Sequence, residues 1–246
     1  MAELDIVIPV YNEGWNILSV MKVFRREVKT PFRVLICYDF DEDDTLSALA
    51  GSPYEKTMVE YVKNPGTGPG LAIAEGLKIS RAAAVLVYMA DDDYNAALID
   101  KMMDEYRRGA DVIAGSRWMK GGSAVGAPQH KEILTRIANF LMFRFGGLPT
   151  SDGTNAFRLF SRRLLNAVEV ESTEGFTFTL ELAAKAHRLG WKIVEIPAQW
   201  FERKDKPSRF RILDWSPAYL RWFFYVFATT WLSRGPETVR QRDGGK

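Results

Sequence analysis

Apolar and polar positions alternate along the first half of the chain in blocks that predict strands separated by helices. Residues 15–28 carry their apolar side chains at helical spacing, and residues 70–80 have the composition of a second helix. Near-continuous apolar strands joined by helices are typical of a parallel sheet that is covered on both faces. The strand-like runs lie at 5–10, 33–38, 57–62 and 83–90.

The second half of the chain is less regular but continues the mixed pattern. Helical spacing of apolar residues predicts a helix over 133–145, and another helix ends at Gly190. The glycine-rich stretch 119–128 predicts a mobile loop. Further strands are expected at 111–118, 154–161 and 192–197. The whole pattern predicts an α/β fold.

A polar cluster follows each of the first four predicted strands. The clusters read PVYNEG, YDFDEDDT, KNPGTGPG and MADDDYN. In open parallel sheets, ligands bind beyond the carboxyl ends of the strands, where these clusters would all lie. The arrangement predicts a nucleotide or a similar ligand along that edge.

Three consecutive aspartates, Asp91, Asp92 and Asp93, form the most unusual of these clusters. One or two of them could cap the helix that follows. Adjacent carboxylates raise each other's pKa unless a cation lies among them. Mg²⁺ or Mn²⁺ coordinated by one or two carboxylates and by phosphate oxygens would remove that repulsion, so metal or diphosphate binding is the preferred interpretation.

The other clusters allow both structural and binding interpretations. Glu13 could hold a ribose diol, although PVYNEG is equally typical of a turn that begins a helix. Asp39, at a strand end, suits recognition of a base by its N–H groups. The acids at 41–44 are expected to cap a helix at Thr45 and to face water, and the glycines at 66–70 to allow close packing.

Positive charge gathers in the later half of the chain. Arg117 and Arg158 each lie in a predicted strand or directly after one. The segment 201–211 contains Arg203, Lys204, Lys206, Arg209 and Arg211. Such a run is often a solvated face, but beside a diphosphate it would bind phosphate, since arginine pairs with phosphate through two hydrogen bonds.

Composition and charge narrow the function further. The chain has 246 residues and a net charge of +2, which does not favour nucleic acid as a partner. The single cysteine, Cys37, excludes an internal disulfide and fits a reducing compartment. His130 and His187 are expected to be structural, and the N-terminus shows no secretion-signal pattern, so we expect a cytoplasmic location.

The most aromatic segment of the chain is 215–232. Its 18 residues approach the length of a membrane span, but Pro217 and Arg221 interrupt it. Its tryptophans and tyrosines favour a pair of helices at a membrane interface. A core helix, a contact in a homo-oligomer and a true span are the alternatives.

These motifs resemble, in order, those of the inverting family 2 glycosyltransferases, and among them the dolichol- and polyprenyl-phosphate mannose synthases. The resemblance covers most of residues 4–211. It is carried by IVIPVYNEG, YDFDEDDT, GPGLAIAEG, VYMADDD, GSRW, SDGTNAFRLFSRRLL, GFTFTLELAAKAHRLGWKIVEIPAQWFER and SRF. It implies a GT-A fold with a Rossmann-like, mostly parallel sheet and C-terminal amphipathic helices. The implied catalytic domain spans 1–212, with a nucleotide-binding half (about 1–118) and an acceptor half (about 119–212), and 213–246 form an interfacial tail.

The resemblance also implies roles for individual residues. It assigns Pro9, Tyr11 and Glu13 to the nucleotide, Asp39 to the base, and Asp92 with Asp91 to the metal and diphosphate. Asp152 would lie near the point of transfer, with Arg117, Arg158, Arg203 and Arg209 around the acceptor or the pyrophosphate. Many relatives have Asp-Ala-Asp where this chain has Ala90-Asp91-Asp92-Asp93, so the choice of metal ligands stays open.

The activity that the resemblance implies is metal-dependent transfer of a sugar, with inversion, from a nucleotide-diphosphate donor to a lipid phosphate. An acceptor phosphate is already anionic at neutral pH, so it needs cations more than a base. A saccharide or other hydroxyl acceptor, with Asp152 as base, is the alternative. A sugar-nucleotide binding protein without turnover is the third interpretation. The enzyme would be peripheral on the cytoplasmic face of a membrane.

Overall fold

The computed structural model describes residues 2–202 and 212–242, with the side chains of 212–214 outside the description. The strands are β1 (Leu4–Pro9), β2 (Phe32–Tyr38), β3 (Val59–Lys63), β4 (Ala84–Val87), β5 (Val112–Ser116), β6 (Ser123–Val125), β7 (Arg158–Ser161), β8 (Ile193–Pro197) and β9 (Gln199–Phe201). The helices are α1 (Gly14–Glu27), α2 (Asp44–Leu49), α3 (Glu55–Met58), α4 (Pro69–Ile79), α5 (Ile99–Arg107), α6 (Gln129–Arg144), α7 (Arg162–Ala167), α8 (Phe178–Arg188) and α9 (Ile212–Trp231), with 3₁₀ turns η1 (Ala96–Leu98) and η2 (Pro236–Thr238).

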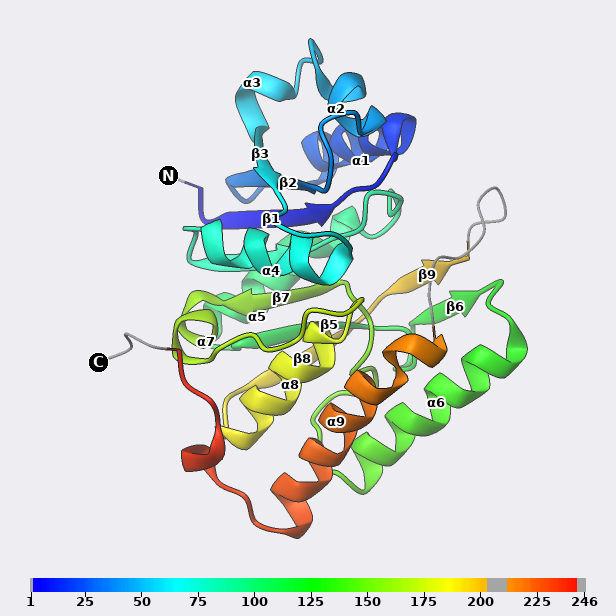
Figure 1. The fold of residues 1–246 in the computed structure, drawn as a ribbon, viewed down its shortest axis with the longest axis vertical. Coiled ribbons are helices and arrows are strands. Elements are labelled where there is room, and N and C mark those ends of the chain that lie inside the picture. Colours follow the sequence, from blue (N-terminus) through cyan, green and yellow to red (C-terminus); the bar gives the residue numbers. More distant parts are fainter. Residues whose placement is uncertain (1, 203–211, 243–246) are drawn as a thin grey trace.

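A seven-stranded sheet with the order β3-β2-β1-β4-β7-β5-β8 forms the centre of the molecule (Figure 1). β7 runs antiparallel to both of its neighbours, β4 and β5, whereas the other strand pairs in this sheet are parallel. The predicted mostly parallel sheet is therefore confirmed. The strand expected at 154–161 is shorter than predicted, because residues 154–157 form the loop that leads into β7.

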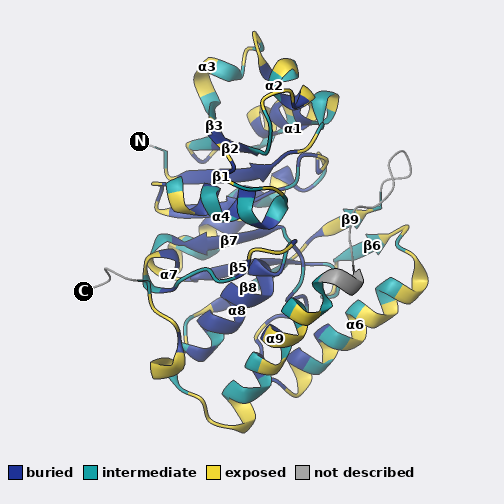
Figure 2. Cartoon of the chain, viewed as in Figure 1, coloured by how far each residue is buried: buried dark blue, intermediate teal, exposed yellow. Residues whose placement is uncertain are grey.

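Two apolar cores lie on opposite faces of this sheet, because successive strand residues point to opposite sides. In β1, Ile6 and Ile8 pack with α1 and α5, whereas Val7 packs with α4 and α8. Figure 2 shows most of the central strands and α8 as buried. This two-sided burial explains why the strands read as continuous apolar runs.

Hydrogen bonds connect the first two polar clusters at the carboxyl edge of the sheet. The backbone N–H of Asn12 donates to Asp43 at 3.0 Å, and that of Glu13 donates to Thr45 at 2.9 Å. Asp43 also accepts from the Thr45 N–H at the start of α2. The helix-capping role expected for residues 41–44 is thus confirmed for Asp43, which is buried rather than facing water.

The glycine-rich stretch 119–128 contains a short strand that pairs with another strand. This finding corrects the expectation that the whole stretch is a loop. β6 within it pairs in parallel with β9. Gly122 makes a close approach possible, since a Cβ there would lie 2.3 Å from the carbonyl oxygen of Ser116. The pattern was missed because three residues of strand among glycines carry almost no periodicity.

The aromatic segment forms one helix, α9, instead of the expected pair of helices. Trp222 and Val226 on one side of α9 are buried against the core beside α8. Leu220, Phe224 and Trp231 on other sides are exposed. No helix in the described ranges combines the length and the hydropathy that crossing a bilayer requires.

Candidate active site

A cavity of about 1060 Å³ lies beyond the carboxyl ends of β1, β2 and β4. One end is polar and is formed by the clusters that follow these strands. The other end is apolar and runs between α6 and α9. The polar end includes Pro9, Tyr11, Glu13, Asp39, Gly68 and Asp91, and the apolar end includes Leu134, Ile137, Leu141, Tyr219, Leu220 and Phe223.

Asp39 connects the end of β2 to the glycine-rich loop before α4. One carboxylate oxygen accepts a hydrogen bond from the Asn64 side-chain amide at 2.7 Å, and the other accepts from the Gly68 N–H at 2.8 Å. Gly68 has a φ of 95°, which favours glycine. A carboxylate has about four acceptor sites, so Asp39 keeps capacity to accept from a base while it holds this loop.

Tyr11 and Glu13, in the loop after β1, line the polar end of the cavity together with Asp39. Asn12 between them has a φ of 54°, a left-handed conformation in which Asn is more common than most residues. Its N–H bond to Asp43, described above, holds this turn. The Glu13 carboxylate accepts from the Asn16 side-chain amide at 2.7 Å, and the Tyr11 ring packs edge-on against Phe40.

The three consecutive aspartates do not share one environment. Asp92 is buried, and its carboxylate accepts from the Tyr88 hydroxyl, from the N–H groups of Tyr94 and Asn95, and from the Asn95 side-chain amide. Burial raises the pKa of Asp92 to about 6, against the opposing effect of these hydrogen bonds. Asp91 is exposed, and both Asp91 and Asp92 line the cavity.

Asn95 joins the acidic loop to β9. Its side-chain amide donates to the carbonyl oxygen of Gln199 at 2.8 Å, and its side-chain oxygen accepts from the Gln199 N–H at 3.0 Å. The Tyr94 hydroxyl also accepts from the Phe201 N–H. These residues were missed from the sequence, where the only signal was an asparagine three positions after a candidate capping aspartate.

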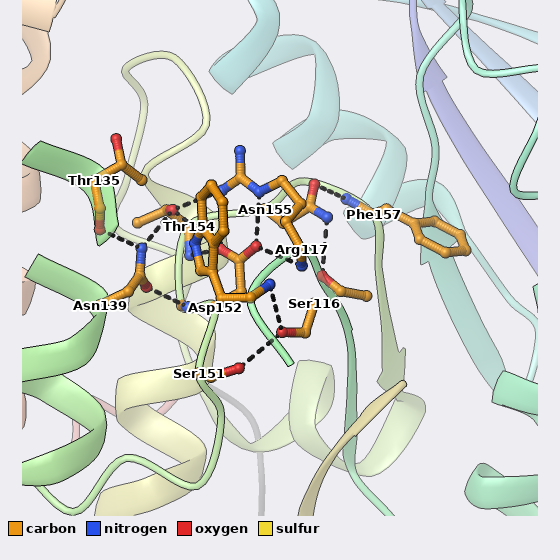
Figure 3. Close-up of polar contacts among 12 residues, drawn as sticks. Ser116, Arg117, Thr135, Asn139, Ser151, Asp152, Thr154, Asn155 and Phe157 are labelled. Carbon is orange, nitrogen blue, oxygen red and sulfur yellow. Dashed lines mark hydrogen bonds and ion pairs between the residues drawn. The ribbon is translucent and has the colours of Figure 1, made fainter. Parts of the chain in front are cut away.

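Arg117 and Asp152 form a two-point ion pair beside the cavity (Figure 3). The Arg117 Nε lies 2.7 Å from one carboxylate oxygen, and Nη2 lies 2.9 Å from the other. Burial alone would raise the pKa of Asp152, but the charge and the hydrogen bonds of Arg117 hold it below its usual value. Asp152 is fully buried, whereas Arg117 reaches the cavity wall. A carboxylate that is held ionised by two hydrogen bonds from an arginine is a weak proton acceptor.

Arg158 supports the same turn from the core side. Its guanidinium is fully buried and donates to the carbonyl oxygens of Asp152 and Thr179. Burial lowers its pKa to about 10, so it remains charged at neutral pH. These contacts give Arg158 a role in shaping residues 152–154, behind the surface that a substrate would touch.

Asn139 connects this turn to α6. Its side-chain oxygen accepts from the Gly153 N–H at 2.6 Å, and its amide donates to the Thr154 hydroxyl at 3.2 Å and to the Thr135 carbonyl oxygen (Figure 3). Sequence reasoning also missed Asn139, since it sits within a helix of otherwise apolar periodicity.

The structure thus brings most of the expected residues to one cavity or its immediate support. The predicted site residues Arg203 and Arg209 lie outside the described residues. Within 2–202 and 212–242, no three Asp, Glu, His or Cys side chains gather in a group that could hold a metal by themselves. Asp91 and Asp92 on the cavity wall could supply one or two oxygens to a divalent cation, and hard cations commonly combine such carboxylates with oxygens of a bound phosphate.

Comparison with known proteins agrees with this architecture. The chain is 26% identical over 228 residues to the polyprenol monophosphomannose synthase of Mycolicibacterium smegmatis, with 85% of each chain covered. It is 27% identical to the glycosyltransferase CsbB of Bacillus subtilis over an alignment of 180 residues. This alignment covers 72% of this chain and 53% of CsbB.

A solved structure shares the fold at low sequence identity. Glucosyl-3-phosphoglycerate synthase of Mycobacterium tuberculosis, solved with Mn²⁺, uridine diphosphate and glucosyl-3-phosphoglycerate, superposes with a TM-score of 0.65 at 16% identity, over 93% of this chain and 79% of that one. The expected GT-A fold is confirmed. The sequence profile described as glycosyl transferase family 2 matches residues 5–168. The chain therefore belongs to glycosyl transferase family 2.

Proposed function

We propose that this protein transfers a sugar, with inversion, from a nucleotide-diphosphate donor to the phosphate of a polyprenyl lipid. The observation that carries the proposal is the form of the cavity, which joins a polar, acid-lined end to an apolar channel between α6 and α9. A donor that carries a sugar and a diphosphate matches the first end, and a phosphate on a long apolar chain matches the second.

The donor would occupy the polar end. Asp39 and the loop that contains Tyr11 and Glu13 lie where a base and a ribose can accept and donate hydrogen bonds. The glucosyl-3-phosphoglycerate synthase with the same fold was solved with uridine diphosphate and Mn²⁺, and in another crystal with Mg²⁺. These complexes support a nucleotide diphosphate together with a divalent cation as the ligand.

Asp91 is the residue we propose as the protein ligand of that cation. Its carboxylate is a hard oxygen donor, suited to Mg²⁺ or Mn²⁺, and it lies on the cavity wall. Asp92 fits this role less well, since both of its oxygens accept hydrogen bonds from the protein. When bound, the cation would neutralise charge on the diphosphate leaving group.

Arg117 would face the acceptor phosphate from the cavity wall. In the proposed reaction, an oxygen of that phosphate attacks the anomeric carbon while the bond from this carbon to the donor diphosphate breaks. With a second pKa of about 6, the phosphate is anionic before it binds, so no base has to remove a proton. The absence of a need for a base agrees with the ion pair between Asp152 and Arg117, which makes the Asp152 carboxylate a poor base.

An acceptor hydroxyl remains the second candidate because of one specific finding. The neighbour of similar fold was solved with glucosyl-3-phosphoglycerate, a small product without a lipid. The apolar side chains of α6 and α9 along the cavity favour the lipid phosphate over a small polar acceptor. A binding protein without turnover is the third candidate.

Transfer assays would separate these candidates. Purified protein would be mixed with UDP-, GDP- or dTDP-sugars and Mn²⁺, and offered a short polyprenyl phosphate, 3-phosphoglycerate or a free sugar. We expect a glycolipid product from the polyprenyl phosphate alone. Product from 3-phosphoglycerate or a sugar instead would favour the second candidate, and donor binding without any product would favour the third.

A further inference from the structure

The helix α6 has its apolar side turned away from the core. Of its 16 residues, only Asn139 and Met142 are buried. Ile133, Ile137 and Phe140 are 57%, 52% and 58% exposed. A surface helix of a soluble protein normally turns its apolar side chains toward the core. Several large apolar side chains that face outward therefore indicate a surface that a membrane or another protein covers.

The outer side of α9 continues this surface. Phe224, Trp231 and Leu232 are 63%, 67% and 67% exposed. The two helices meet at their C-terminal ends, where the Trp231 indole N–H donates to the Phe145 carbonyl oxygen at 2.7 Å. We call the exposed side chains of Ile133, Ile137, Phe140, Phe224, Trp231 and Leu232 the outer apolar face.

The segments that carry the outer apolar face contain more positive than negative charge. Segments 129–147 and 215–234 contain five lysines and arginines but one acid, Glu132. Beside Phe224, a depression of about 390 Å³ is lined by Arg188, Arg221 and Arg234. Arg221 shares its charge with Glu171, yet its side chain is 58% exposed. Exposed aromatic and aliphatic side chains interleaved with cations are suited to an anionic lipid surface.

The cavity opens beside this surface. Ile137 belongs both to the outer apolar face and to the cavity wall, and its neighbours Leu134 and Leu141 line the channel. A protein partner that covered this surface would also cover the channel between α6 and α9. A bilayer would instead present lipid molecules to it.

We propose that the outer apolar face docks on an anionic phospholipid bilayer, with α6 and α9 lying in the plane of the interface. Only the preference for a bilayer over a protein partner rests on the proposed function. Exposure of the side chains and excess of positive charge are independent of it.

Vesicle sedimentation of the whole protein tests the proposal. Phosphatidylglycerol–phosphatidylcholine vesicles would be compared with phosphatidylcholine vesicles at low and high salt. The test variants are Ile133→Glu/Phe140→Glu and Phe224→Glu, which change side chains outside the cavity wall. Trp15→Glu is the matched control, since Trp15 is 86% exposed at the start of α1.

We expect the wild type and the Trp15 control to bind the anionic vesicles, with weaker binding at high salt. The double variant should bind at least about tenfold less, a loss of about 1.4 kcal/mol or more, because two large apolar side chains no longer enter the lipid and two added carboxylates face an anionic surface. Wild type that stays in the supernatant, or a double variant that sediments like wild type, would overturn the proposal. So would a dimer, seen by analytical ultracentrifugation, that the double variant abolishes.

The same variants separate this proposal from the proposed function. With a short, water-soluble polyprenyl phosphate and no vesicles, they should retain wild-type transfer within about twofold, because the substituted side chains lie outside the cavity wall. Vesicle binding without transfer to any lipid phosphate would leave the docking surface valid and reject the acceptor. Transfer to a lipid phosphate without vesicle binding would support the acceptor and reject the docking surface.

Discussion

Three neighbouring carboxylates at Asp91, Asp92 and Asp93 differ because the backbone directs them to different places. Asp92 turns inward, where four donors from Tyr88, Tyr94 and Asn95 satisfy it. Asp91 and Asp93 stay exposed, and Asp91 lines the cavity. The capping interpretation of the triplet therefore fits Asp92, whose hydrogen bonds order the loop, whereas cation binding by Asp91 stays a proposal.

Asparagine substitutions at Asp91 and Asp92 should affect different properties, donor binding in the first case and folding stability in the second. We expect Asp91→Asn to weaken Mn²⁺-dependent binding of the donor by at least about tenfold, because loss of a residue that merely supports a metal ligand already costs about 10–100-fold, and we expect the stability to be unchanged. Asp92→Asn should retain binding within a few fold but lower the free energy of unfolding by about 1–3 kcal/mol, since its amide would face donors. Calorimetry and thermal unfolding measure the two effects. Equal loss of binding in both variants would contradict this division of roles.

The ion pair of Arg117 and Asp152 predicts a pH-dependent loss of stability. Arg117→Met leaves a fully buried carboxylate without its cation, which typically costs about 3–5 kcal/mol of unfolding free energy at pH 7. In the wild type the pKa of Asp152 lies below its usual value, so the stability that this carboxylate contributes is present at neutral pH and is lost as the pH falls through that lowered pKa.

In the variant the pKa of Asp152 should rise, because the charge and the side-chain hydrogen bonds of Arg117 no longer oppose the effect of burial, although the backbone N–H at position 117 and the charge of Arg158 still do. The variant would take up a proton on acidification and recover stability relative to wild type. The difference between the two should therefore shrink as the pH falls from 7 to 5. Urea unfolding at both pH values measures it, with Arg117→Met/Asp152→Asn as a control that lacks this titration. A difference that stays constant with pH would contradict the prediction.

At the scale of elements, α4 begins in contact with the loop before α8. A Cβ added to Gly70 would lie 2.4 Å from the carbonyl oxygen of Thr173. Helix propensity alone would make Gly70→Ala stabilising by about 1 kcal/mol. Because backbone atoms form this contact, we expect overpacking to dominate and the variant to lose about 1–3 kcal/mol.

Thermal unfolding of Gly70→Ala, with Ala74→Gly on the same helix as a control, checks this prediction. The control should lose about 1 kcal/mol through propensity. A stabilised Gly70→Ala would mean that the loop before α8 can yield without cost. In that case the contact with Thr173 would not be the reason for a glycine at this position.

The sequence predicted the elements that carry a strong period and missed those fixed by distant partners. The strands of the first half are apolar because helices cover both faces, so their pattern identified them. β6 has three residues and exists because β9 lies beside it. The α6 pattern predicted a helix with an apolar side but not the direction of that side, since periodicity shows that a face is apolar and not what covers it.

The same limit applies to the candidate site. The rule that ligands bind at carboxyl ends of parallel strands placed Asp39, Glu13 and Asp91 on one edge. It could not reveal that Asp152 would lie behind Arg117, or that Asn95 and Asn139 would hold the surrounding loops. These roles depend on pairing between residues far apart in the chain, such as Asn95 with Gln199.

At the scale of the whole molecule, residues from both halves of the chain line the one cavity described above. The strands of the first half supply the acids, while α6 and α9 of the second half supply the apolar channel. If that channel holds the chain of a lipid acceptor, a change inside it should affect acceptor and donor differently.

Ala138→Phe tests this coupling, because Ala138 lies on α6 within the channel and is half-buried. The larger side chain should obstruct a polyprenyl chain and lower kcat/KM for a long-chain polyprenyl phosphate by about tenfold or more, a barrier increase of about 1.4 kcal/mol. Donor affinity, measured by calorimetry without acceptor, should stay within about twofold, since the change is confined to the apolar end. Phe143→Ala, on an exposed position of the same helix, is the control. Equal loss with long and very short acceptor chains would mean that the channel does not hold the lipid.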